Sequence, residues 1–482
     1  MLRKILLIIF VFALLFTRFY NLSATTRFDH DDARNLRDIH RIWVTKDITL
    51  IGPINGAKNI IYPSLTFYML LPFSYWGNFE PDSLALGAAF YGVATAILLV
   101  YLVSLVNKKF IFWASILTLL WFPLVDSSRI AWNPHLVPFI QILALIFFLK
   151  SENNRKLLLV SGFLFGLTFH LHYFSIVSTA TFLVILFVKG FVTEKSRKLQ
   201  NLKNNLLLLI SFAAAFIPFV IFDLLKPPGL FFGRFLHENI VGSGGGNMSV
   251  FLITTINNFK LLFNHLSGGN LIIFLFLVFS FSYLVINDAR KRKVNLVYFL
   301  PVFTQIVAIS FLPEYFNRYF YLSIGFFVVW LFSKREKSQE NVVKLTVILM
   351  LAASLGSVRD YLTKPVREPS ALTVRFINNY IASRVHSDNL KNVNITVLQS
   401  PDPDPFGVIY RESLLVKDVT FLPENQYDIT DNLFVVTTGD EDQVRKDPAN
   451  LINGFRDGVV DDKYSLRNSK WRVLLIKRHE NF

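Results

Sequence analysis

The densest cluster of charged residues in this chain is RFDHDDARNLRD, residues 27–38, which carries four acidic residues and three arginines. Three of the carboxylates, Asp29, Asp31 and Asp32, fall within four residues. Carboxylates this close repel one another, and the repulsion raises the proton affinity of at least one of them. Such a group can take a proton from an attacking hydroxyl group, so the cluster is a candidate site of general base catalysis.

Two other interpretations of this cluster stay open. Aspartates are favoured at the start of a helix, where they accept hydrogen bonds from backbone N–H groups and complement the helix dipole. The acids can therefore simply begin the helix that follows them. The run DHDD at 29–32 can also bind a divalent cation, which is the less favoured interpretation; we expect no metal and no cofactor.

The elements that carry the cluster are those of a membrane protein. Of the 482 residues, 53% are hydrophobic and 17% are charged, with 50 phenylalanines, and the apolar residues come in blocks. A polytopic, mainly α-helical membrane bundle follows from this pattern. We expect about eleven spans, at residues 5–22, 84–106, 110–126, 135–149, 157–171, 173–188, 206–224, 270–287, 295–312, 319–332 and 345–357.

The positions of the basic residues orient these spans. If the N-terminus is cytoplasmic, twenty Lys and Arg residues fall in the six short inside loops, as the positive-inside rule requires. The net charge of +15 is then explained by topology, and no nucleic-acid partner is needed. A cleaved signal peptide at the N-terminus is disfavoured, because no small-residue cleavage site precedes Arg18 and its removal would invert every later loop. An odd number of spans places the C-terminus outside.

Two regions are expected outside the membrane. The first is the outer segment 23–83, in which Leu36, Ile39 and Ile42 lie at helical spacing and predict an amphipathic helix on the outer membrane surface. The second is a small soluble α/β domain over 358–482, separate from the membrane domain over 1–357. Strands are predicted at 394–400, 432–438 and 471–478, and a helix at 371–385.

The order of several short motifs resembles the membrane-embedded GT-C-type glycosyltransferases of the protein O-mannosyltransferase and aminoarabinose transferase family. An apolar anchor is followed by Asp31-Asp32-Ala33-Arg34 and then by Tyr62-Pro63-Ser64-Leu65, where that family has D-E-x-R and P-P-L-x-Y. Later stretches agree in order, and the resemblance covers roughly residues 1–335. They are SRIAWNPHLVP at 128–138, GLTFHLHYFS at 166–175 and LPEYFNRYF at 312–320.

The resemblance implies transfer of a sugar from a polyprenyl-phosphate donor to an acceptor hydroxyl group, with inversion, on the outer side of a bacterial cytoplasmic membrane. Asp31 would be the general base, and Asp32 would orient it or the acceptor. Arg34 would hold the leaving phosphate. Consistent with a lipid-linked donor, the sequence has no glycine-rich nucleotide-binding motif; GSGGGN at 242–247 follows no strand and reads as an outer loop.

Further residues are assigned to the same site by the resemblance. Arg129 and Arg318 are candidate phosphate ligands, although a structural place at the membrane interface explains each equally well. The residues expected to line the substrate cavity are Tyr62, Asn133, His172 and Tyr319. For His172 a purely structural role is the favoured alternative.

The chain also departs from the family pattern. Asp32 stands where the family has Glu. Tyr62 replaces a lysine, and Asn133 replaces a second acid, of the aminoarabinose transferases. The acceptor can therefore be a lipid, a glycan or a protein, and neither aminoarabinose nor lipid A is implied.

Two other classes of membrane protein compete with a transferase. A lipid-linked sugar flippase or transporter would carry ionisable residues in mid-span and often repeated halves, whereas here the charges lie in surface loops. An envelope polysaccharide polymerase or ligase is closer, but it would favour a large late outer loop rich in Arg and His. The acidic first outer segment favours the transferase.

Overall fold

The structure is a computed structural model. It describes residues 2–55, 60–152, 154–192, 195–227, 229–231, 248–291, 295–310, 318–400, 404–467 and 469–478. The chain divides into two compact units. The first comprises Met1–Tyr20, Thr49–Thr66 and Ala88–Leu362, and the second comprises Asn21–Ile48, Phe67–Gly87 and Thr363–Phe482. The acidic segment thus groups with the C-terminal residues, and the predicted linear division at residue 357 stays a prediction.

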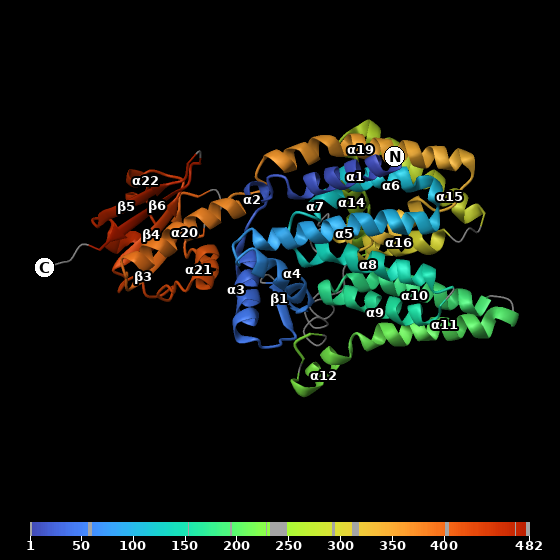
Figure 1. Ribbon diagram of the computed structural model, residues 1–482, viewed down its shortest axis with the longest axis horizontal. Coiled ribbons are helices and arrows are strands. Elements are labelled where there is room, and N and C mark those ends of the chain that lie inside the picture. The colour runs from blue at the N-terminus through green and yellow to red at the C-terminus, as the bar shows by residue number, and fades with distance from the viewer. Residues whose placement is uncertain are drawn as a thin grey trace. The chain divides into compact units, whose positions relative to one another are not determined.

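The first unit is almost entirely helical (Figure 1). Its helices are α1 (Leu2–Phe19), α5 (Ser83–Val106), α6 (Ile111–Leu120), α7 (Phe122–Asp126), α8 (Asn133–Lys150), α9 (Lys156–Leu171), α10 (Ser175–Val192), α11 (Lys195–Ala214), α12 (Ile217–Leu225), α14 (Met248–Ser267), α15 (Leu271–Arg290), α16 (Leu296–Ile309), α17 (Arg318–Tyr321), α18 (Ile324–Leu331) and α19 (Lys337–Thr363). A short 3-10 helix, η1 (Lys108–Phe110), precedes α6. The strands β1 (Ile51–Asn55) and β2 (Ile60–Pro63) pair antiparallel.

Every predicted apolar segment contains helix, so the mainly α-helical fold class is confirmed. Within the described residues, four helices are long and apolar enough to cross a membrane: α5, α8, α15 and α19. A fifth span forms if Leu199–Ala214 and Ile217–Leu225 are counted as one element bent by 44°. Pro218 at the start of α12 explains that break, since proline fits the first turn of a helix but not its interior.

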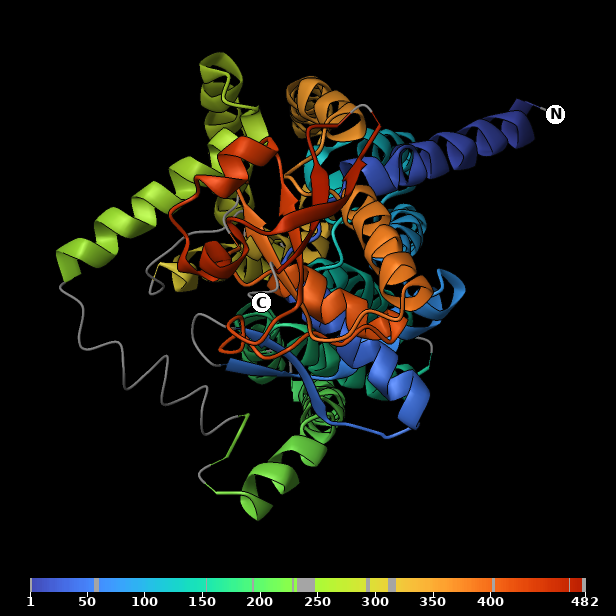
Figure 2. The same cartoon turned by 90° about the vertical axis from the view of Figure 1, so that its left-hand side faces the viewer.

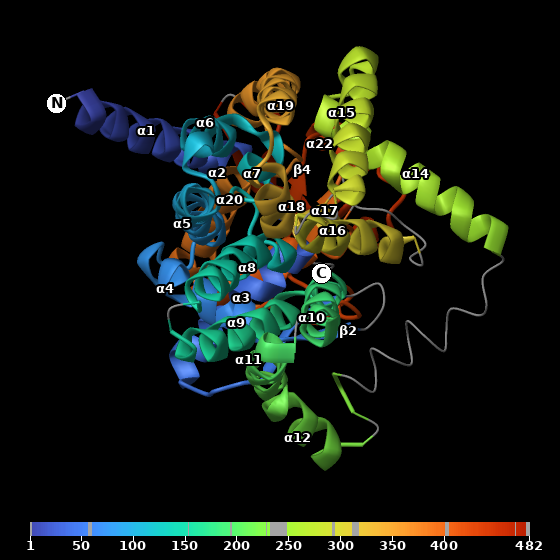
Figure 3. The same ribbon diagram turned by 90° about the vertical axis from the view of Figure 1, so that its right-hand side faces the viewer.

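The core of the first unit is built from aromatic rings. Every residue of α18 is buried, and α18 packs against α8 and α16 (Figure 3). The rings of Trp121 and Phe327 stack with centroids 5.7 Å apart, and Phe165 and Phe326 stack at 6.0 Å. These contacts place several large aromatic rings inside the bundle.

A fully buried ion pair fastens the chain after α18 to α15. Arg335 Nη1 lies 2.7 Å from both carboxylate oxygens of Asp288, and both side chains are completely buried. Trp330 Nε1 and Asn295 Nδ2 each donate to the same carboxylate at 3.2 Å. Buried charges are stable when they are paired and hydrogen-bonded, and this carboxylate has three side-chain partners.

The second unit contains a four-stranded sheet, which Figure 2 shows in orange and red. The strands are β3 (Val393–Leu398), β4 (Asn432–Thr437), β5 (Val459–Ser465) and β6 (Arg472–Lys477), in the order β3-β4-β6-β5. Only β3 and β4 pair in parallel. Its helices are α2 (Leu22–Thr25), α3 (His30–Thr45), α4 (Leu65–Trp76), α20 (Ala371–Ser387), α21 (Val408–Leu414) and α22 (Glu441–Arg445), with 3-10 turns η3 (Leu415–Lys417) and η4 (Asn450–Phe455).

The predicted C-terminal α/β architecture is confirmed, with one strand in addition. Strands β3, β4 and β6 and helix α20 fall where the sequence predicts them. Strand β5 was not predicted, because its residues alternate between exposed and half-buried and include Asp461 and Asp462.

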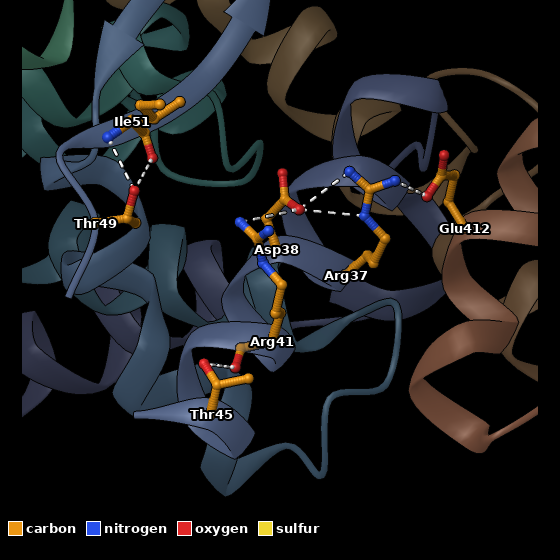
Figure 4. Close-up of polar contacts among 7 residues, drawn as sticks. All are labelled: Arg37, Asp38, Arg41, Thr45, Thr49, Ile51 and Glu412. Atoms are coloured by element: carbon orange, nitrogen blue, oxygen red, sulfur yellow. Dashed lines mark hydrogen bonds and ion pairs between the residues drawn. The ribbon is translucent and has the colours of Figure 1, made fainter. Parts of the chain in front are cut away.

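Helix α3, which begins with the acidic cluster, is bonded to the C-terminal part of its unit. The backbone N–H groups of Val366 and Ala371 donate to the carbonyls of Thr25 and Thr26, each at 2.9 Å. Helix α3 packs against α21, where Arg37 forms an ion pair with Glu412 (Figure 4). The predicted helix is therefore present, and its place on a membrane surface stays a prediction.

Candidate functional site

The N-terminus of α3 is formed by a capping box. The side chain of Asp29 accepts the backbone N–H groups of Asp31 and Asp32, at 3.1 and 3.2 Å. In return, the side chain of Asp32 accepts the N–H group of Asp29 at 3.1 Å. This reciprocal arrangement satisfies the unpaired donors at the start of the helix. Two of the three clustered carboxylates are thus used to begin the helix.

Asp32 is the buried member of the cluster, with 6% of its surface exposed. Burial, and then the neighbouring carboxylate of Asp29, raise the pKa of Asp32 well above its usual range, against the opposing charge of Arg27. Arg27 also pairs with Asp29 at 3.3 Å. The repulsion expected from the sequence therefore acts on Asp32, which the fold has already engaged in the capping box.

Asp31 is the accessible member. Its side chain is 48% exposed, and its carboxylate forms an ion pair with Arg34 one helical turn later. Arg34 has further N–H groups beyond the one that contacts Asp31, because a guanidinium carries five donors. The structure thus places one accessible carboxylate next to one cation on the same face of α3, as a base and a phosphate ligand would require.

The raised pKa of Asp32 predicts how stability depends on pH. Because the folded protein holds this proton more tightly than the unfolded chain, the stability that Asp32 contributes is fully present below the unfolded pKa of about 3.9 and is lost as pH rises through the raised folded value. An amide in place of this carboxyl group would keep an acceptor oxygen for the Asp29 N–H group without ionising. We expect Asp32→Asn to raise the melting temperature relative to wild type, and more at about pH 8 than at about pH 5. Thermal melts measure the difference in melting temperature between Asp32→Asn and wild type. A difference that becomes smaller as pH rises would contradict a raised pKa for Asp32.

Four residues predicted to line a cavity lie close together in the first unit. His172 Nδ1 accepts the backbone N–H of Phe174 at 3.3 Å, so in the neutral ring Nε2 carries the proton, and Nε2 lies 3.4 Å from the Tyr62 hydroxyl group. The rings of His172 and Tyr319 meet edge to face at 5.4 Å. Asn133 Nδ2 donates to the carbonyl of Leu171, the residue before His172, at 2.6 Å.

This Tyr62–His172–Tyr319–Asn133 group joins the end of β2, the end of α9, α17 and the start of α8. Tyr173 fastens it further, because its hydroxyl group donates to the carbonyl of Ile61. The fold thus brings together aromatic and amide groups that suit recognition of a polar ligand. Whether they line the substrate cavity stays a prediction.

Arg129 is 1% exposed, and its side chain lies at the C-terminal end of α1. Its guanidinium donates to the carbonyls of Arg18 and Tyr20, at 2.9 and 3.0 Å, and so caps the C-terminus of α1. Arg18 caps α6 in the same way, through the carbonyls of Thr118 and Leu119. These contacts give Arg129 a structural role, and a phosphate-binding role for it stays a prediction.

Arg318 is the first residue of α17, directly before Tyr319. Its side chain, and residues 312–317 of the LPEYFNRYF stretch, lie outside what the structure describes, as does GSGGGN at 242–247. A phosphate-binding role for Arg318 stays a prediction. Among the described residues, no group of three or more His, Asp or Glu side chains is arranged to hold a metal ion.

One polar group in the first unit was not predicted. The Tyr321 hydroxyl group donates to Asp126 at 2.7 Å, and the Tyr321 ring lies 5.3 Å from the ring of His135. Asp126 is the only acidic residue between 110 and 150. A single acid at the end of a long apolar stretch was the available signal, because such a residue needs a polar partner.

Comparisons with known proteins show the fold. No family model matches the sequence, and no curated protein matches it. Among solved structures, the crystal structure of ArnT from Cupriavidus metallidurans in the apo state is similar over 99% of this chain and 98% of its own, with a TM-score of 0.60 and 10% identity. The structure of the same protein bound to undecaprenyl phosphate covers 98% of this chain and 97% of its own, with a TM-score of 0.56 and 11% identity.

At this low identity the likeness is one of fold. The predicted GT-C-like architecture is confirmed as an ArnT-like fold over nearly the whole chain. Together with the apolar helices, this fold is that of an integral membrane protein.

Proposed function

We propose that this chain, which has the fold of ArnT, is a membrane-embedded glycosyltransferase that moves a sugar from a polyprenyl phosphate to an acceptor hydroxyl group. The observation that carries the proposal is the match of fold over 99% of the chain to a protein that has also been solved with undecaprenyl phosphate bound. The acidic start of α3 supplies the accessible carboxylate that such a transfer needs.

The proposed reaction is a single displacement. The acceptor oxygen forms a bond to the anomeric carbon of the sugar while the bond from that carbon to the phosphate oxygen breaks. Asp31 takes the hydroxyl proton, and polyprenyl phosphate leaves with the bonding electrons. Attack from the side opposite the leaving group inverts the anomeric configuration. The base raises the nucleophilicity of the acceptor only as the new bond forms.

Each residue of the cluster has a separate part in this proposal. Asp29 and Asp32 fix the start of α3 through the capping box, and so set where Asp31 lies. Arg34 pairs with Asp31 and has further N–H groups for a donor phosphate. Arg318 is the second proposed phosphate ligand. The groups proposed to contact the substrates from the first unit are Tyr62, Asn133, His172 and Tyr319.

The site is proposed to face the outer side of a bacterial cytoplasmic membrane, with the N-terminus inside. Support comes from the basic residues of the predicted inside loops and from the absence of any sequence motif for a nucleotide sugar. The acceptor is a lipid, a glycan or a protein exposed on that side. The protein needs membrane lipids around its apolar helices, and the proposal includes neither a nucleic-acid partner nor a cofactor.

The donor class is the direct test of this proposal. We expect the purified protein, reconstituted in lipid nanodiscs, to transfer sugar from polyprenyl-phosphate sugars and to keep its activity when a chelator is present. Transfer from a nucleotide sugar in the absence of any lipid carrier would overturn the proposal.

A further inference from the structure

The second unit contains a polar and aromatic pocket of about 300 Å³ that the proposed reaction does not use. It lies between the start of α20, the turn after β5 and Ala24 of α2. Its volume is at the lower end of the range of small-molecule sites, about 300–1,000 Å³. The side chains that shape it are Glu368, Ser370, Phe376, Tyr464, Leu466 and Arg467.

One wall of the pocket is a fixed aromatic surface. Tyr464 stacks on Tyr380 with ring centroids 4.5 Å apart and an angle of 7° between the rings. The Tyr380 hydroxyl group is held by Asp462 at 2.8 Å. Phe376, one turn before Tyr380 on α20, keeps 43% of its surface exposed. The Tyr464 ring is therefore oriented before any ligand binds, which lowers the entropy lost on binding.

Opposite charges complete the pocket. One oxygen of Glu368 accepts the backbone N–H of Ser370 and the Nε1–H of Trp471, both at 3.2 Å, which fixes the carboxylate. Arg467 is exposed and has no ion-pair or hydrogen-bond partner among residues 2–478 as far as the structure describes them. A carboxylate and a guanidinium can each form two parallel hydrogen bonds with neighbouring hydroxyl groups.

We propose that this pocket binds a saccharide and is the acceptor subsite of the protein. A sugar ring offers C–H groups to an aromatic face and hydroxyl groups at its edge, which matches rings on one wall and charged groups on the others. A lipid tail would cover the charged groups of Glu368 and Arg467 with apolar chain and would offer the Arg467 guanidinium no hydrogen-bond acceptor. The proposal rests on the proposed function, and it identifies the acceptor as a glycan.

The pocket is connected to the acidic cluster within the same unit. Ser370, which lines the pocket, pairs with Arg27 in a β-bridge, and Arg27 in turn forms an ion pair with Asp29. The N–H group of Phe28 donates to the carbonyl of Pro369 at 3.3 Å. A saccharide bound there is thus held by the same short stretch of chain that leads into Asp31.

Binding of the full-length protein to a glycan array of bacterial envelope saccharides tests the proposal. The protein is reconstituted in nanodiscs, because maltoside detergents carry a competing sugar. We expect wild type to bind a subset of the array, and Phe376→Ala and Arg467→Ala each to weaken that binding at least tenfold. The matched control is Phe406→Ala, which removes a 39%-exposed phenylalanine of the same unit that does not line the pocket. The control should bind as wild type does.

Two results would overturn the saccharide site. In the first, wild type binds no saccharide on the array. In the second, the pocket variants bind as well as wild type and melt at the same temperature. Failure of the proposed reaction gives a different pattern. In that case the array binding persists and depends on Phe376, but no sugar is transferred from polyprenyl phosphate. Comparing the array with the transfer assay therefore separates the two proposals.

Discussion

Asp31→Asn is expected to lower turnover by roughly a factor of 100 or more, the usual effect of removing a positioned general base. The substitution keeps the size and hydrogen-bonding shape of the side chain but removes the proton acceptor. Asp29 and Asp32 are untouched, so the capping box and the start of α3 should persist. Binding of the donor should survive, because Arg34 is unchanged.

The matched control for this experiment is Asp38→Asn. Asp38 lies on the same helix and pairs with Arg37 (Figure 4), but it is not one of the three carboxylates at the start of α3, which are Asp29, Asp31 and Asp32. We expect near-normal turnover from this variant. Arg34→Ala should instead weaken donor binding, because a phosphate partner is lost. Full activity in folded Asp31→Asn would transfer the role of base to Asp32 or Asp29, and full activity in every single variant would remove the cluster from the site.

The largest effect on stability is expected at the buried ion pair of the first unit. Asp288→Ala should destabilise the fold by about 3–5 kcal/mol, the range measured when one partner of a buried pair is removed. It leaves the Arg335 guanidinium buried without its counter-charge, and it removes the acceptor of Trp330 and Asn295. A large fall in melting temperature in nanodiscs is the measurement.

The double variant Asp288→Leu, Arg335→Leu is the control. Replacing both charges by apolar side chains is often neutral or stabilising, so the double variant should melt well above Asp288→Ala. Recovery should be incomplete, because the Trp330 N–H group is left without its carboxylate acceptor. If Asp288→Ala melts at the same temperature as wild type, the ion pair does not stabilise the contact between α15 and the chain after α18.

The helical part of the fold was predictable because its apolar blocks are long and bounded by charge. Helix α14 was not predicted. Its apolar residues are interrupted by Asn257, Asn258 and Lys260, so its hydropathy is low. Strand β5 was missed for a related reason, since an edge strand with one exposed face carries few apolar residues. Neither α14 nor β5 can be predicted without knowing the elements that pack against it.

The grouping of α3 with the C-terminal domain could not be read from the sequence. It depends on pairs such as Arg37 with Glu412 and His30 with Asp404, which are hundreds of residues apart. A charged surface helix predicts that partners exist but does not identify them. Burial acts to raise the pKa of Asp404, but the ion pair with His30 and the N–H groups of Val408 and Ile409 together lower it below its usual value.

The sequence predicts a helix that starts at the acidic cluster, but it does not predict which of the three aspartates form the cap. Three aspartates at a helix start allow both capping and catalysis, and only the structure shows that Asp29 and Asp32 form the cap while Asp31 stays accessible. Arg129 illustrates the opposite case. An arginine in an outer loop suggested a phosphate ligand, but its Nη1 and Nη2 groups donate to carbonyls at the end of α1, more than a hundred positions earlier.

The release of polyprenyl phosphate is the most direct measure of the proposed sugar transfer. Purified wild type, Asp31→Asn and Asp38→Asn, each in nanodiscs and with matched melting temperatures, are given the polyprenyl-phosphate sugars extracted from the source cells together with the envelope glycan fraction. Released polyprenyl phosphate is then measured by mass spectrometry. We predict release by wild type and Asp38→Asn, and a rate at least about 100-fold lower in Asp31→Asn. Equal release by all three proteins, or no release by wild type, would contradict it.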